Sequence, residues 1–187
     1  MDALRRPCDP NVRMLAALAV TGPVCCMLGA FELFRDARRQ LQSLPDDPHL
    51  NELSRAAWYM TCGAKLSFCL EDEAALDELR IGEELAASAK LRHVEFLSVD
   101  FRAWHLAWHF AIPEATAALE RMRTLADLDR PLERLYLMWV EAALLSVEGK
   151  GHEALSLLRP AQNVAIGIGS QAHLLIGSLL HCGPLIM

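Results

Sequence analysis

The strongest indication of the fold lies in residues 118–158, which read ALERMRTLADLDRPLERLYLMWVEAALLSVEGKGHEALSLL. Apolar side chains recur there every three or four positions, which is the period of an amphipathic helix. Asp129 and Pro131 interrupt the pattern with the signals of a helix start, and Gly149–Lys150–Gly151 interrupts it with a turn. This stretch therefore predicts helices that follow one another through short turns.

The composition extends this prediction to the whole chain. Leu (33) and Ala (27) far outnumber Val (8), Ile (6) and Thr (4) among the 187 residues, so helix-forming residues dominate over strand-forming ones. With 53% hydrophobic and only 22% charged residues, the chain is too apolar to be disordered and long enough to bury one sizeable core. We expect an all-α fold with a single domain spanning residues 1–187.

A short motif recurs along the chain. It reads ALDEL at residues 75–79, ALERM at 118–122 and ALSLL at 154–158, with spacings of 43 and 36 residues. A tryptophan precedes each copy by 14 to 17 residues, and small Ala beside Leu allows two helices to approach closely. Helical hairpins repeated at about this length build an α-solenoid, an α-α superhelix. The alternative is an irregular helical bundle in which the spacing is accidental.

Turn signals divide the chain into about nine helices. Pro160 falls inside the eighth helix, where a proline removes a backbone hydrogen bond, so we expect a kink there or an early end near Leu158. The predicted hairpins are residues 1–48, 53–92, 93–128 and 131–169, followed by a final helix at 170–182.

The order of Trp, an Ala-rich helix, a short turn and Ala–Leu at a second helix resembles tetratricopeptide repeats. It is most similar to the degenerate hairpins of MalT-like and related bacterial transcriptional activators, over the range Trp58 to Ser170. The resemblance implies a sensor or scaffold arm that lies, in those regulators, between a nucleotide-binding ATPase and a helix-turn-helix domain. The phosphate-loop pattern GxxxxGK[ST] does not occur in this sequence, so neither the ATPase nor the DNA-binding activity is transferred to it.

The charge pattern argues against nucleic acid and anionic lipid as direct partners. The formal net charge is −6, and residues 49–187 carry all of that excess. Arg35, Arg38 and Arg39 form the one basic cluster, which we interpret as a solvated helix face because their spacing is what such a face produces.

The cysteines and the N-terminal region indicate a cytoplasmic protein. None of the six cysteines forms a CxxC pair, so we expect reduced thiols and neither a zinc ribbon nor a redox site. The apolar stretch from Met14 to Phe34 is split at Gly22 and Pro23, so we expect neither a signal peptide nor a membrane span.

Two histidines stand out as chemistry-bearing residues. His105 and His109 lie four positions apart, which places both rings on one helix face and could hold a transition metal, with His93, Glu141 or His152 as a third ligand. The alternative is that both simply pack beside Trp104 and Trp108. We predict no catalytic residue, no cofactor and no enzymatic activity. In a solenoid of hairpins the first helices line a groove, so the candidate groove residues are Tyr59, Arg102, His105, His109, Tyr136 and Glu141.

The sequence therefore predicts a non-catalytic module that binds a protein, a peptide or a small-molecule effector, as the sensor or scaffold part of a bacterial transcriptional regulator. A metal-binding helical bundle that uses His105 and His109 is the alternative. Self-association through the apolar final helix and a chain that is a fragment of a larger regulator are further interpretations, since nothing in the sequence covers Leu174 and Leu175.

Overall fold

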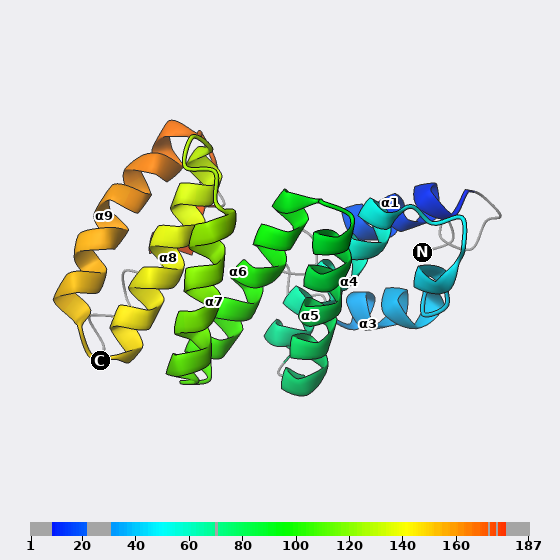
Figure 1. Cartoon of the computed structure of the whole chain (residues 1–187), viewed down its shortest axis with the longest axis horizontal. Coiled ribbons are helices and arrows are strands. Elements are labelled where there is room, and N and C mark those ends of the chain that lie inside the picture. The colour runs from blue at the N-terminus through cyan, green and yellow to red at the C-terminus, as the bar shows by residue number, and fades with distance from the viewer. Residues whose placement is uncertain (1–8, 22–30, 70, 172, 175, 179–187) are drawn as a thin grey trace. The chain divides into compact units, whose positions relative to one another are not determined.

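The computed structural model describes residues 9–21, 31–69, 71–171, 173–174 and 176–178. Every regular element in this described part of the chain is helical, which confirms the predicted all-α fold class. The elements are α1 (Pro10–Thr21), α3 (Phe31–Gln40), the short 3₁₀-helix η2 (Leu44–Asp46), α4 (Glu52–Phe68), α5 (Asp72–Ser88), α6 (Arg92–Trp108), α7 (Ile112–Leu125), α8 (Pro131–Val147) and α9 (Gly151–Gly167) (Figure 1).

The contacts divide the chain into two compact units, and their boundary falls inside α6. The N-terminal unit comprises residues 1–101, and the C-terminal unit comprises residues 102–187. The single domain, the solenoid arrangement and the resemblance to tetratricopeptide repeats stay predictions.

Trp58 lies in the core of the N-terminal unit. It projects from α4, is 3% exposed, and belongs to one buried cluster with Met14 of α1 and Phe34 and Ala37 of α3. The α1 and α3 helices also contact each other. Trp58 of α4 thus packs against residues of both preceding helices, α1 and α3.

The α4 and α5 helices pack closely because each carries a glycine at their interface. A Cβ atom added at Gly63 of α4 would lie 2.5 Å from Leu79 Cγ and 2.9 Å from the carbonyl oxygen of Ala75. A Cβ atom added at Gly82 of α5 would lie 2.9 Å from the backbone nitrogen of Met60. Backbone and side chain therefore meet at a separation that only glycine allows at both places.

Local signals fix where these helices begin. The Asn51 side chain accepts a hydrogen bond of 2.7 Å from the backbone N–H of Ser54, so it caps α4. Asp72 and Glu73 occupy the first turn of α5, where negative charge interacts favourably with the helix dipole. Pro131 is the first residue of α8, as predicted.

In the C-terminal unit, α8 and α9 pack side by side (Figure 1). Leu135 and Trp139 of α8 share a buried cluster with Ala154 and Leu158 of α9. The α7 helix contacts α8, and Arg123 of α7 forms an ion pair of 3.0 Å with Glu141 of α8. The small residue of each predicted motif is buried, since Ala75, Ala118 and Ala154 are at most 1% exposed.

The early end that the sequence suggests near Leu158 is wrong, because α9 continues to Gly167 with Pro160 inside it. Pro160 and Ser156 are both exposed, so water can bind the Ser156 carbonyl that a proline leaves without its helical donor. Ala161 and Ala165 extend the buried face of α9 beyond the proline and keep the helix packed. The described residues between Gln171 and Ser178 are helical, and the rest of the predicted final helix lies outside the described residues.

Gly63→Ala tests the close approach of α4 and α5. A methyl group has to displace backbone atoms there, so we expect a loss of about 2 kcal/mol in the free energy of unfolding, as overpacking typically costs. Gly167→Ala is the matched control, because no atom lies within 4 Å of the added Cβ. It should stabilise the protein by about 0.5 kcal/mol through helix propensity. Urea unfolding followed by circular dichroism measures both, and equal effects would contradict the interpretation.

The buried carboxyl group of Asp100 should make the free energy of unfolding depend on pH. Its side chain is buried, its Oδ1 atom has no hydrogen-bond partner, and burial raises its pKa to about 8. The folded state therefore holds a proton that the unfolded state loses near pH 4, so this contribution to stability declines as the pH rises from 4 to 8. Asp100→Asn stays neutral, and its advantage over the parent protein should grow across that range by at most about 1.4 kcal/mol per pH unit. A pH-independent difference in urea unfolding would contradict this account.

Candidate functional site

The described residues of the N-terminal unit contain a pocket of about 400 Å³. Three helices and the segment after α3 contribute to it, and a volume of this size matches small-molecule sites in other proteins. Its lining consists of Phe34, Arg35, Arg38 and Arg39 from α3, Gln42 and Pro45 after that helix, Trp58, Tyr59 and Leu66 from α4, and Glu78 from α5.

The arginines line the pocket because of the periodicity of α3. Phe34 and Ala37 are fully buried on the core side of this helix. Arg35, Arg38 and Arg39 are spaced three and four positions apart on the adjoining face, so their side chains share one side of α3. The apolar stripe that packs α3 onto α4 thereby also directs three guanidinium groups to the pocket.

An ion pair crosses the pocket from α3 to α5. Arg38 Nη2 donates to Glu78 Oε1 at 2.5 Å, and the Glu78 side chain is only 14% exposed. Burial alone would lower the pKa of Arg38, but the hydrogen bond and the negative charge of Glu78 outweigh it and raise that pKa. Arg38 therefore stays a guanidinium cation, and Glu78 is held by a charge-assisted hydrogen bond.

Arg35 is held by two carboxylates. Its Nε atom lies 3.2 Å from Glu71 Oε1, and its Nη1 atom lies 2.6 Å from Glu32 Oε1. These hydrogen bonds to Glu71 and Glu32 raise the pKa of Arg35. Arg39 pairs with Asp36 one turn earlier on the same helix. All three arginines are thus positioned by carboxylates.

Tyr59 supplies a phenol to the pocket, and burial followed by the charges of Glu78 and Asp46 raises its pKa. It is therefore a neutral hydroxyl group at physiological pH. Cys62, one turn further along α4, is buried in the core, and burial raises the pKa of its thiol. A thiol of that kind is a poor nucleophile.

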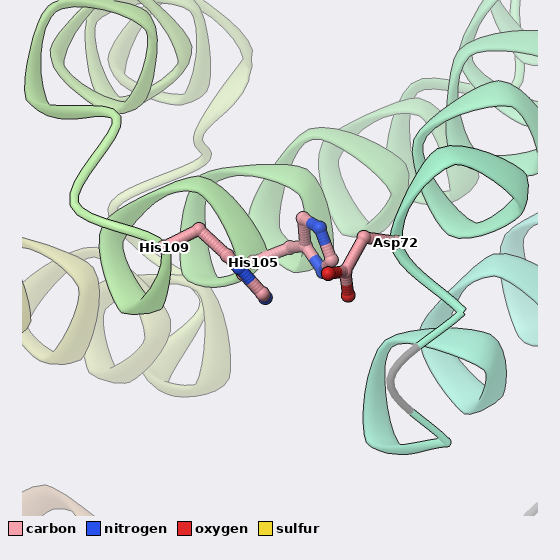
Figure 2. A group of neighbouring side chains, drawn as sticks. All are labelled: Asp72, His105 and His109. Carbon is pink, nitrogen blue, oxygen red and sulfur yellow. The ribbon is translucent and has the colours of Figure 1, made fainter.

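The two histidines that the sequence singles out lie together in the C-terminal unit. The backbone N–H of His109 donates to the carbonyl of His105 at 3.1 Å, which continues the helical path one residue past the end of α6. Their rings stack with centroids 4.4 Å apart (Figure 2), and one ring nitrogen of each lies within 4.8 Å of the other. His105 is buried and His109 is exposed. Asp72, which Figure 2 also labels, belongs to the N-terminal unit, where it begins α5.

A second histidine cluster surrounds His173. Its Nε2 atom lies 2.9 Å from the hydroxyl of Tyr136, and its Nδ1 atom lies 2.6 Å from the hydroxyl of Ser170. The ring of Trp139 stacks on it at 5.8 Å, and burial lowers the pKa of His173. Ser170 also accepts from the backbone N–H of His173, as a helix cap does. Both ring nitrogens are engaged, so this cluster ties the residues after α9 to α8.

The six predicted groove residues fall into separate groups. Tyr59 lines the pocket of the N-terminal unit, whereas the other five belong to the C-terminal unit. There, His105 and His109 stack on each other, Tyr136 contacts His173, and Glu141 pairs with Arg123. Arg102 lies on α6 and is partly buried.

Sequence reasoning found one lining residue of the pocket as a site residue and missed the rest. The arginine cluster was visible in the sequence, but its spacing alone indicated a solvated face. The pattern that could have indicated the site is that the same turns of α3 also carry Phe34 and Ala37. These two residues pack into the core, so the arginines next to them lie at the edge of the core. No local sequence pattern marks Glu78 as a site residue, because only the tertiary packing places it opposite Arg38.

No family model matches the chain, and neither a curated protein nor a solved structure matches it. Among the helices of the described residues, none has the length and apolar content needed to cross a membrane.

Proposed function

We propose that this chain is a non-catalytic helical binding module whose ligand occupies the pocket of the N-terminal unit. The observation that carries the proposal is a cavity of about 400 Å³ with charged, hydroxyl and amide groups positioned around it by three helices. Concave sites with a few oriented polar groups are the usual form of ligand sites. Arg38 and Glu78 support it further, since their ion pair preorganises the opening before a ligand arrives.

The resemblance to MalT-like sensor modules favours the same class of function. On that basis we propose that the module serves as the sensor or scaffold part of a bacterial transcriptional regulator, in which the bound ligand changes how the module docks on a protein or peptide partner. The acidic body, with a net charge of −6, favours a partner of basic or mixed charge.

A fragment screen by saturation-transfer NMR tests binding at the pocket, with acidic, basic and neutral fragments against the full chain. We expect a subset of the fragments to bind and the binding of each to be lost in Gln42→Trp, because Gln42 is an exposed lining residue and the larger indole obstructs the cavity. Gln40→Trp is the matched control, since Gln40 is exposed and lies outside the lining. Circular dichroism verifies that both variants fold. Fragments that bind equally to both variants, or no binding at all, would contradict the proposal.

A second candidate function is transition-metal binding by His105 and His109. The two imidazoles lie four positions apart with their rings stacked, so they offer two nitrogen ligands of the kind that Zn²⁺ or Ni²⁺ binds. Because a histidine that binds a metal must be deprotonated, metal binding should weaken as the pH is lowered.

Elemental analysis after loading with ZnCl₂ and gel filtration tests the metal site. We expect Zn²⁺ to be retained by the parent protein and lost in His109→Ala, a substitution of an exposed side chain that should leave the fold intact. His105→Ala should behave in the same way. His49→Ala is the control, since His49 is exposed in the other unit. Equal Zn²⁺ content in all four proteins would dismiss this function.

A further inference from the structure

The charge of the pocket lining is the first indication of what it binds. Three arginines and one glutamate give the lining residues a formal charge of +2 in a protein that is acidic overall. The remaining partners of these arginines lie outside the lining, and their side chains are 80% exposed at Glu32, 49% at Asp36 and 40% at Glu71. These carboxylates pair with the arginines from outside the lining, so the charged groups that line the pocket itself are the three guanidinium groups and the carboxylate of Glu78.

The hydrogen-bonding groups of the lining are mostly donors. A guanidinium group carries five N–H bonds. Arg38 donates to Glu78 and is also hydrogen-bonded to the Cys62 thiol, Arg35 donates to Glu71 and Glu32, and Arg39 donates to Asp36. The remaining guanidinium N–H groups can only donate, whereas the Gln42 amide and the Tyr59 hydroxyl can both donate and accept, and Glu78 accepts. A carboxylate satisfies such a set, because its two oxygens accept from a guanidinium group in a bidentate manner.

The shape of the lining groups indicates the rest of the ligand. Guanidinium groups and the ring of Tyr59 are flat, and both stack on aromatic faces. Trp58 and Leu66, which are 3% and 1% exposed, are the buried apolar part of the lining and are called its apolar floor. Glu78 works against ligands of high negative charge, because its own carboxylate remains in the pocket. A flat molecule with one carboxylate meets all of these conditions.

We infer that the pocket of the N-terminal unit binds a small organic acid with an aromatic body, whose carboxylate is held by Arg38 and Arg39. This inference rests on the proposed function, since it names the class of ligand for the same pocket. The carboxylate lies against the guanidinium groups of α3, and the aromatic body lies against Tyr59 and the apolar floor.

Calorimetric titration with three probes of one shape tests the ligand class. The probes are 1-naphthoate, 1-naphthalenemethanol and 1-naphthylmethylamine, which are anionic, neutral and cationic at pH 7. We expect 1-naphthoate to bind about tenfold more tightly than the alcohol, as a charge-assisted hydrogen bond provides, and the amine to bind most weakly. The advantage of 1-naphthoate should shrink between low and high NaCl concentration.

Two variants locate the carboxylate. Arg38→Gln should lower the affinity for 1-naphthoate about tenfold while changing the affinity for the alcohol by less than about twofold. Because Arg38 also holds Glu78, Arg39→Gln is the second variant, and its side chain is exposed enough for the fold to tolerate the change. Arg80→Gln is the matched control, since Arg80 is an exposed, ion-paired arginine of the same unit outside the lining.

The outcomes separate this inference from the proposed function. Equal or tighter binding of the alcohol or the amine overturns the organic acid, as does a lack of binding by all three probes. Unchanged affinity for 1-naphthoate in both arginine variants overturns the placement of the carboxylate. None of these results decides the outcome of the fragment screen with Gln42→Trp. A screen in which no fragment binds, or in which Gln42→Trp changes nothing, would overturn the proposed function itself.

Discussion

The N-terminal unit is built around the close approach of α4 and α5, where Gly63 and Gly82 let each helix reach the backbone and side chains of the other. The remainder of the unit depends on that separation. Leu79 lies against Gly63, and the adjacent residue Glu78 is thereby placed where Arg38 of α3 can reach it. Trp58, on the same helix as Gly63, is buried by α1 and α3. The pocket exists because a tight helical pair presents a carboxylate and two aromatic rings to a third helix.

Ion pairs that are partly shielded from water position the charged side chains around the pocket. A carboxylate that is 14% exposed would lose favourable hydration on folding, and the Arg38 guanidinium compensates for that loss. The same ion pair fixes the direction of Arg38, while Glu71 and Glu32 fix Arg35. Such an arrangement has its polar groups in place before binding, which lowers the entropic cost of receiving a ligand. The pocket takes its polar groups from three helices, whereas the stacked pair of His105 and His109 lies on one helical turn of the C-terminal unit and is partly exposed.

The periodicity of apolar residues was enough to predict the helices, but it could not predict which residues line the pocket. Apolar residues three and four positions apart located α7 and α8, and the Ala of each repeated motif proved to be buried, because both properties are encoded within a few turns. Of the two outcomes expected from Pro160, the early end near Leu158 is wrong, because α9 continues through the proline with buried alanines on either side of it. The ion pair of Arg38 with Glu78 joins residues 40 positions apart, and no local pattern reports a contact over that distance.

A crystal structure of the full chain grown with 1-naphthoate tests the central claim most directly, namely that this pocket receives a flat organic acid on its arginines. The account predicts naphthalene density against Tyr59, with the carboxylate oxygens within hydrogen-bond distance of Arg38 or Arg39. Density for the probe elsewhere on the molecule, or a pocket that holds only water at saturating 1-naphthoate, would contradict it.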